Sequence, residues 1–206
     1  MTFDLSLYLI TDPKMCAERG LVETVIAAVR GGVTMVQLRD KYATDAELIE
    51  QAKTLKSALA GSGIPLIIND RLEVALAADA DGLHIGQTDG DAVAARKALG
   101  PDAILGLSIN TSEQLAAADT SLLDYVGLGP VFATSTKSDH EAPLGFEGLA
   151  ALASASPLPS VAIGGLQAQH VVPVRDAGSQ GVAVISAICA APDPQAAAQR
   201  FVKTPA

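Results

Sequence analysis

Short apolar segments alternate with alanine-rich segments of helical periodicity along almost the whole chain, and this alternation limits the folds that the chain can adopt. Each apolar segment has the length of one buried strand, and each following segment has the length of one helix. We predict strands at residues 7–11, 35–39, 65–69, 82–86, 104–109, 125–129, 160–164 and 181–186. We predict helices at residues 20–30, 45–60, 72–78, 91–99, 112–118, 146–153, 168–177 and 193–202.

The predicted elements also form a weak internal repeat. The segments "ADADGLHIG", "SLLDYVGLG" and "DAGSQGVAVI" each combine a helix end, a turn with Asp or Gly, and a buried strand. A repeat of roughly 20–25 residues that holds one strand and one helix is a βα unit. Eight such units predict a single-domain (β/α)8 TIM barrel over residues 1–206. A doubly wound open sheet is the alternative, and the number of strands favours the barrel.

Composition and charge exclude several classes of function. Hydrophobic residues make up 49% of the chain and aromatic residues only 3%, which indicates a core of small aliphatic side chains. The net charge of −9 argues against a nucleic-acid-binding surface, and it requires that any anion site be built locally. The two cysteines form no CxxC pair, no signal peptide is apparent, and no apolar run reaches the length of a membrane span. We therefore expect a cytoplasmic protein with no membrane or nucleic-acid partner.

Acidic residues follow two neighbouring predicted strands at the point where each strand ends. Asn69 and Asp70 close the segment "PLIIND", and Asp89 comes shortly after "GLHIG". Each could instead cap the helix that follows it, and Asp91 competes with Asp89 for that role. Because the carboxyl ends of the strands meet at the mouth of a barrel, the two acids could face each other, and they would repel unless a cation joined them. Oxygen ligands without a His or Cys cluster favour Mg²⁺, with waters and substrate phosphates completing its shell.

Basic residues at the end of an earlier strand indicate an anion at the same mouth. In "VQLRDK", Gln37, Arg39 and Lys41 alternate, so the period of a strand places them on one face. The alternative is a solvated Lys41 and an Arg39 that is paired with a helix carboxylate. Two cations at the mouth of a barrel are better explained by a bound anion.

The later strands add groups that suit a phosphate. Ser108 ends one strand, the run "TSTK" at residues 134–137 follows another, and Gly164-Gly165 and Ser186 close the last two. In this fold a phosphate commonly binds after strands seven and eight, where glycine lets backbone N–H groups approach it. Read separately, these residues could be a small core residue, a flexible polar loop and a tight turn. Together they predict two phosphate-bearing substrates, one of which needs Mg²⁺, and displacement of a diphosphate leaving group. His84 lies in an apolar run, where a core residue is the commoner reading.

The segments "LYLITD", "GGVTMVQLRDK", "PLIINDR", "ADGLHIGQTD", "ILGLS", "DYVGLGPVFATSTK", "VAIGG" and "GVAVISAI" together resemble the thiamine-phosphate synthase family. The resemblance runs from residue 7 to residue 188. It implies a (β/α)8 barrel that joins hydroxymethylpyrimidine diphosphate to thiazole phosphate, in carboxylated or decarboxylated form, and releases pyrophosphate. It also implies a dissociative, Mg²⁺-assisted mechanism.

The resemblance further implies roles for single residues. The pyrimidine diphosphate contacts would be Gln37, Arg39, Lys41, Asn69, Ser108 and Lys137. The thiazole phosphate contacts would be Thr134, Thr136, Gly165, Ile185 and Ser186, and the Mg²⁺ ligands would be Asp70 and Asp89. The family forms oligomers, so a homo-oligomer is compatible with the sequence.

Two alternatives share the barrel. Thiazole tautomerases bind thiazole phosphate without coupling it, and they resemble the synthases except at the diphosphate positions, where a His lies near the place of Ser108. A non-catalytic phosphate-binding barrel would need neither the two acids nor Lys137, and would usually carry a second domain. The intact "QLRDK", acids, Ser108 and "TSTK" favour a synthase.

Overall fold

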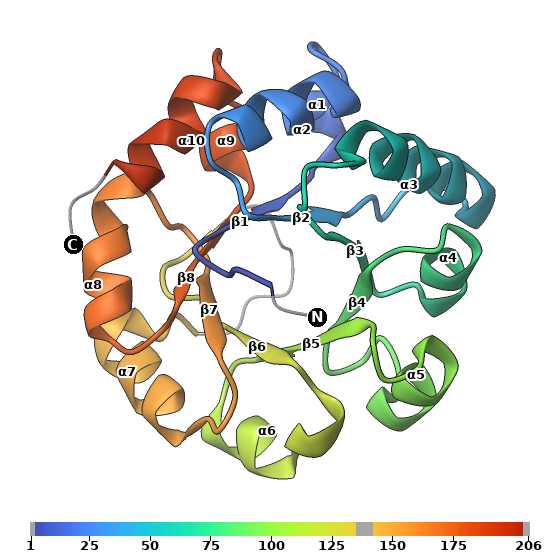
Figure 1. The fold of residues 1–206 in the computed structure, drawn as a ribbon. Coiled ribbons are helices and arrows are strands. Elements are labelled where there is room, and N and C mark those ends of the chain that lie inside the picture. Colours follow the sequence, from blue (N-terminus) through green and yellow to red (C-terminus); the bar gives the residue numbers. More distant parts are fainter. Residues whose placement is uncertain (1–2, 135–141, 204–206) are drawn as a thin grey trace.

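The computed structural model describes residues 3–134 and 142–203, and in these residues eight parallel strands close into a barrel with helices outside it (Figure 1). The strands are β1 (Leu7–Ile10), β2 (Met35–Leu38), β3 (Leu66–Asn69), β4 (Gly82–Ile85), β5 (Ile104–Ile109), β6 (Tyr125–Leu128), β7 (Ser160–Ile163) and β8 (Gly181–Val184). Each strand pairs with the next one in the sequence, and β8 pairs with β1. The predicted TIM barrel is confirmed, and the open-sheet alternative is wrong.

Helices fill the connections between the strands. They are α1 (Pro13–Cys16), α2 (Leu21–Arg30), α3 (Asp45–Leu59), α4 (Leu72–Ala77), α5 (Ala92–Leu99), α6 (Ser112–Ala117), α7 (Gly145–Ala155), α8 (Val171–Asp176), α9 (Ser186–Cys189) and α10 (Pro194–Val202). Two short 3-10 helices, η1 (Thr120–Leu122) and η2 (Ala168–His170), join them. The helix predicted at 168–177 is thus divided into η2 and α8, and the strand predicted at 181–186 ends early because Ser186 begins α9.

Polar side chains fix where several helices begin. At α3, the Thr44 hydroxyl accepts a hydrogen bond from Glu47 N at 3.3 Å, and Thr44 N donates to Glu47 Oε2 at 2.8 Å. This reciprocal pair gives a hydrogen-bond acceptor to two backbone N–H groups that would otherwise have none at the start of the helix. At α1, which was not predicted, Asp12 accepts from Lys14 N and Met15 N, and Pro13 occupies the first turn.

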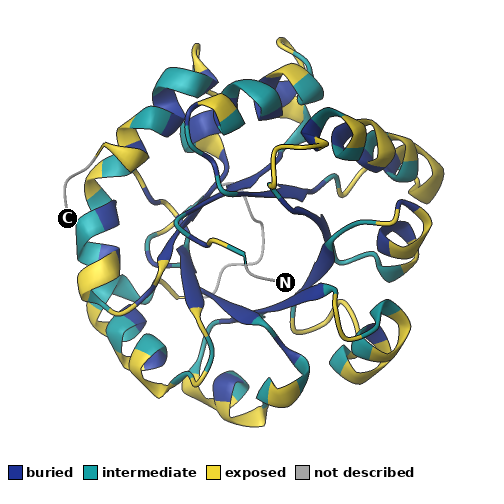
Figure 2. Cartoon of the chain, in the orientation of Figure 1, coloured by how far each residue is buried: buried dark blue, intermediate teal, exposed yellow. Residues whose placement is uncertain are grey.

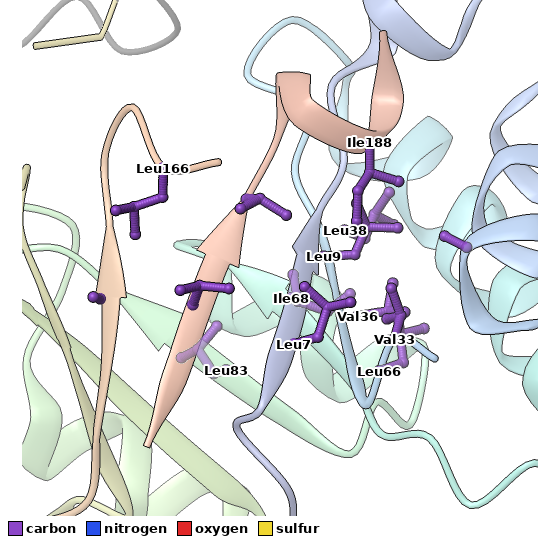
Figure 3. Close-up of a cluster of buried hydrophobic side chains, with 14 of the residues drawn as sticks. Leu7, Leu9, Val33, Val36, Leu38, Leu66, Ile68, Leu83, Leu166 and Ile188 are labelled. Atoms are coloured by element: carbon purple, nitrogen blue, oxygen red, sulfur yellow. The ribbon is translucent and has the colours of Figure 1, made fainter. Parts of the chain in front are cut away.

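Alternation along each strand divides the core into two layers. Leu7 and Leu9 on β1 belong to the outer layer, which lies between the sheet and the helices (Figure 3). Tyr8 and Ile10 on the same strand point the other way and belong to the cluster inside the barrel. The strands are buried and the helices expose their outer faces (Figure 2). Each fully buried aliphatic side chain stabilises the fold by about 1.5–3 kcal/mol, so both layers contribute.

Gly106 leaves space for an aromatic ring inside the barrel. In the strand register, Gly106 on β5 pairs with His84 on β4 and with Tyr125 on β6. A Cβ atom at position 106 would overlap with Cζ, Cε1 and Oη of Tyr125, whose side chain is fully buried. The absence of a side chain at position 106 therefore allows Tyr125 and His84 to meet over β5.

We expect the substitution Gly106→Ala to lower the free energy of unfolding by about 1–3 kcal/mol, because overpacking a filled core forces side chains to move. Chemical denaturation measures this change. The matched control is Gly90→Ala, because a Cβ atom at position 90 would meet no atom within 4 Å. Equal stability of the two variants would contradict the packing described for Tyr125.

Candidate active site

A cavity of about 460 Å³ opens at the carboxyl ends of the strands. It holds residues that follow β2, β3, β4, β5, β6, β7 and β8, so the barrel brings together segments that are far apart in the sequence. Its lining includes the predicted residues Arg39, Lys41, Asn69, Asp70, Asp89, Ser108, Thr134, Gly165, Ile185 and Ser186. The predicted Thr136 and Lys137 lie outside the described residues.

Gln37 is the predicted residue that the structure places away from this lining. Its side chain is buried inside the barrel, and Nε2 donates a hydrogen bond to Tyr8 Oη at 2.7 Å. In this structure Gln37 therefore meets another side chain of the barrel interior, and its contact with a substrate stays a prediction.

Asp70 closes β3 with a backbone conformation that few residues adopt. Its φ angle is +62°, and its N–H donates to the carbonyl of His84 at 2.8 Å. The residue before α4 is Arg71, and no side chain caps that helix. The capping interpretation of Asp70 is therefore wrong. A left-handed conformation costs roughly 1–2 kcal/mol for most residues and less for Asp, so another role for this carboxylate is more attractive.

Asp89 lies at the end of the neighbouring strand and does not cap a helix either. Asp91 is the cap of α5, because its Oδ1 accepts from Val93 N at 3.0 Å. The Asp89 carboxylate lies over Gly86, where a Cβ atom would overlap with Oδ2. The free space at Gly86 thus lets Asp89 fold back toward Asp70.

The two carboxylates act on each other. Burial and then the negative charge of Asp89 raise the pKa of Asp70 above its ordinary value. The positive charge of Lys41 and a 2.6 Å hydrogen bond from Asn69 Nδ2 oppose this shift. Ionised Asp70 is therefore disfavoured in the folded protein as long as no further cation lies between the two acids.

The donor set at this position fits Mg²⁺. The described residues contain no group of three or more His, Cys, Asp and Glu side chains that could hold a metal ion. Mg²⁺ does not need such a group, since it is usually held by one or two carboxylates while waters and substrate phosphates complete its shell. Asp70 and Asp89 are the residues that would hold it.

Arg39 lies buried beside the cavity, and no carboxylate of the described residues is paired with it. It is only 7% exposed, and its Nε atom has no hydrogen-bond partner within residues 3–134 and 142–203. None of the ion pairs between described residues includes Arg39, so the predicted alternative of a paired arginine is wrong. A buried guanidinium N–H without a hydrogen bond is costly, and a ligand anion would satisfy it.

The loop that carries Lys41 is tied to the end of β3. Arg71 Nη1 donates to the carbonyl of Ala43 at 2.7 Å and to Asp45 Oδ1 at 2.9 Å. Because Arg71 directly follows Asp70, this contact holds the loop beside the acidic pair. Lys41 itself is exposed, but it lines the cavity and its charge acts on Asp70.

The opposite side of the cavity is formed by exposed backbone. Gly164 and Gly165 have φ angles of +105° and +63°, which favour glycine. A Cβ atom at Gly165 would come within 2.9 Å of Phe132 Cβ, so the chain turns tightly there. Ile185 and Ser186 join the lining at the start of α9. The residues of the predicted phosphate subsite thus line one side of the cavity, and their binding of a phosphate stays a prediction.

Five polar residues of the lining were not predicted from the sequence as site residues, namely His84, Gln87, Thr88, Asn110 and Gln114. Gln87 Nε2 donates to the Ser108 carbonyl at 2.6 Å, and Asn110 Nδ2 donates to the Gly129 carbonyl at 2.7 Å. The strand period that placed Ser108 at the mouth would also have identified Asn110, two residues further on.

The fold is a TIM barrel, and its cavity combines basic, acidic and hydroxyl groups, the class of site that suits small phosphorylated molecules. More specifically, the family model described as thiamine monophosphate synthase matches residues 7–188, and the chain belongs to this family. Among the described residues, no helix combines the length and the apolar character that a membrane crossing requires.

Individual relatives agree with this assignment. The chain is 55% identical over 201 residues to a thiamine-phosphate synthase of Psychrobacter sp. (strain PRwf-1), which covers 96% of this chain and 94% of the relative. It is 55% identical over 202 residues to a thiamine-phosphate synthase of Azorhizobium caulinodans, covering 98% and 95%. The solved thiamine phosphate pyrophosphorylase from Pyrococcus furiosus has a TM-score of 0.86 at 35% identity, covering 97% of this chain and 94% of that chain.

The raised pKa of Asp70 predicts a pH-dependent effect of the substitution Asp70→Asn in metal-free buffer. Folding disfavours the ionised form, so the wild type loses stability as the pH rises through the folded pKa of Asp70. The asparagine variant carries no such charge, and Asn tolerates the left-handed backbone. We therefore expect the stability of the variant relative to the wild type to increase from about pH 4, near the ordinary aspartate pKa, to pH 7.

Chemical denaturation across this pH range with EDTA measures the difference. Asp91→Asn is the matched control, since Asn caps helices as well as Asp does. A relative stability of Asp70→Asn that stays constant with pH would contradict the repulsion between Asp70 and Asp89.

Proposed function

We propose that the chain is a transferase that forms thiamine phosphate from hydroxymethylpyrimidine diphosphate and thiazole phosphate, with release of pyrophosphate. The observation that carries this proposal is the buried Arg39, which forms no ion pair with the residues that the structure describes, in the same cavity as the carboxylates of Asp70 and Asp89. A buried arginine and two mutually repelling carboxylates that line one cavity fit a diphosphate together with Mg²⁺. Membership of the thiamine monophosphate synthase family then specifies which diphosphate.

The side of the cavity formed by β2, β3 and β4 would bind the diphosphate. Arg39 offers a planar set of N–H donors that suits phosphate oxygens, and Lys41 adds a second positive charge at the entrance. Mg²⁺ held by Asp70 and Asp89 would neutralise charge on the departing diphosphate. Asn69 hydrogen-bonds to Asp70 and so stands beside the same group.

The side formed by β6, β7 and β8 would bind the thiazole phosphate. Gly165 keeps side-chain atoms away from this part of the backbone, and Thr134 and Ser186 contribute hydroxyl groups. Ile185 offers an apolar surface for the thiazole ring. Thr136 at this subsite, and Lys137 at the diphosphate subsite, belong to the proposal through the family resemblance alone. The two subsites face one cavity, so the substrates would meet in it.

The reaction follows from what the two subsites hold. The bond between the pyrimidine methylene carbon and the diphosphate oxygen breaks, and its electron pair leaves with the pyrophosphate. The electron-rich aminopyrimidine supports the methylene cation, and the thiazole nitrogen donates its lone pair to form the new C–N bond. That nitrogen carries no proton, so bond formation needs no base. Charge stabilisation and positioning by Arg39, Lys41 and the two subsites account for the catalysis.

We expect the substitution Arg39→Met to reduce kcat/KM for the pyrimidine diphosphate by about 100-fold or more, because it removes a buried charge that faces the leaving group. Thiamine phosphate is measured as fluorescent thiochrome after both substrates are supplied with Mg²⁺. The matched control is Arg30→Met on the exposed end of α2, which should keep the wild-type rate.

Two results would contradict the proposal. An Arg39→Met variant with wild-type kinetics would remove the role of Arg39. No product from correctly folded wild-type protein would contradict synthase activity itself, and the thiazole tautomer supplied alone would then test for a tautomerase.

A further inference from the structure

A continuous chain of hydrogen bonds crosses the barrel interior and ends at the cavity. Gln37 Nε2 donates to Tyr8 Oη at 2.7 Å, and Tyr8 Oη lies 2.9 Å from Tyr125 Oη. Tyr125 Oη lies 2.8 Å from His84 Nδ1, and His84 Nε2 lies 2.9 Å from Ser108 Oγ. We call these five residues the Gln37–Ser108 relay. They come from β2, β1, β6, β4 and β5, so only the closed barrel brings them together.

Two glycines of the barrel leave space for the side chains of this relay. Gly106 lies between His84 and Tyr125 in the strand register, and a Cβ atom there would overlap with the Tyr125 ring. Gly127 pairs with Ser108, and a Cβ atom there would lie 3.3 Å from His84 Cε1. Two neighbouring strands thus lack side chains at the positions where the relay passes.

Because the relay is buried, its hydrogen bonds must all run in one direction from donor to acceptor. The side chains of Tyr8, Tyr125 and Gln37 are at most 2% exposed, so each polar group must find its partner within the protein. Burial raises the pKa of both tyrosines far above the neutral range, so each phenol keeps its proton. Each hydroxyl then has one hydrogen to donate, and the first donor in the chain fixes the direction of all the others.

The amide of Gln37 is that first donor. Because its Nε2 donates to Tyr8, the Tyr8 hydroxyl donates to Tyr125, and the Tyr125 hydroxyl donates to Nδ1 of His84. A neutral imidazole that accepts at Nδ1 carries its proton on Nε2, which then donates to Ser108 Oγ. The hydrogen of the Ser108 hydroxyl is left to point into the cavity.

We propose that the Gln37–Ser108 relay is a positioning device, which holds His84 as the neutral Nε2–H tautomer and makes Ser108 a hydrogen-bond donor toward an acceptor atom of the pyrimidine diphosphate. The part that concerns His84 is independent of the reaction. The part that concerns the substrate rests on the proposed function. Tyr8 and Tyr125 are positioning residues in this account, since they act through His84 and Ser108.

The alternative is that all hydrogen bonds of the relay run in the opposite direction, and an experiment must distinguish the two directions. If the Gln37 carbonyl faced Tyr8, every hydrogen bond would reverse, His84 would carry its proton on Nδ1, and Ser108 would donate to His84. Ser108 would then offer only lone pairs to the cavity. The tautomer of His84 therefore reports the direction of the whole relay.

The first test is nitrogen-15 NMR of the histidine rings in the full chain without substrates. The chain has three histidines, so a variant with His140→Asn and His170→Asn leaves the signals of His84 alone. We expect a protonated Nε2 and an unprotonated Nδ1 at neutral pH. A protonated Nδ1 would overturn the proposed direction, whether or not the chain makes thiamine phosphate.

The second test is kinetic and uses Tyr125→Phe, which keeps the ring that fills the space over Gly106. We expect kcat/KM for the pyrimidine diphosphate to fall about 10-fold, the effect of losing one oriented hydrogen bond, while KM for thiazole phosphate stays within about twofold. The His84 signals should also lose their single tautomer. The matched control is Tyr42→Phe, because the Tyr42 side chain is 77% exposed.

Tyr8→Phe provides a second variant if Tyr125→Phe does not fold. It removes the bias toward one direction but leaves a donor beside His84, so we expect a smaller effect of the same kind. Wild-type kinetics in folded Tyr125→Phe would overturn the role in substrate positioning. If the wild type makes no thiamine phosphate, the proposed function fails, while the NMR result still decides the direction of the relay.

Discussion

The repulsion between Asp70 and Asp89 is the interaction on which the rest of the candidate site depends. Asp70 is held in a left-handed backbone conformation, and its ionised form is disfavoured by burial and by the charge of Asp89. Neither carboxylate caps a helix, since α4 has no side-chain cap and Asp91 caps α5. Strained conformations persist where the surrounding structure enforces them, and they cluster at active sites. The proposed cation, shared by both acids, would account for this arrangement.

The net negative charge of the chain opposes the binding of an anion, so an anion site needs positive charges close to the ligand. A protein with a net charge of −9 repels a diphosphate at long range. Arg39 and Lys41 therefore have to act at short range, and the barrel supports this by burying Arg39 and by tying the Lys41 loop to Arg71. In the proposed function, the acidic pair would hold a divalent cation, and this cation and the two basic residues would surround one leaving group.

Much of this arrangement could be predicted from the sequence because it follows from two simple rules. The alternation of strands and helices gave the barrel, and the polar residues at the strand ends gave Arg39, Asp70 and Asp89, since parallel strands end at one mouth. The division of the helix predicted at 168–177 and the early end of β8 depend on local caps and on the start of α9. Those are details of three or four residues that hydrophobic periodicity does not resolve.

The role of His84 could not be predicted, because it depends on partners that are distant in sequence. Tyr125 lies 41 residues after His84, and Ser108 lies 24 residues after His84. Their contacts require the strand register and the absence of side chains at Gly106 and Gly127. The same holds for Gln37. The alternation of side chains along its strand predicted that it lies at the mouth of the barrel, whereas the structure pairs it with Tyr8 inside the barrel. Two of the three tyrosines lie inside this barrel, although aliphatic side chains fill most of the core of this chain.

The central claim is that the acidic pair binds a cation which in turn binds a diphosphate. Isothermal titration calorimetry of pyrophosphate tests it directly, with Mg²⁺ or with EDTA, on the wild type and on Asp70→Asn. The account predicts that Mg²⁺ strengthens binding to the wild type by at least about 10-fold, or about 1.4 kcal/mol, and that Asp70→Asn loses this gain. Equal affinity with and without Mg²⁺, or an undiminished gain in Asp70→Asn, would contradict it.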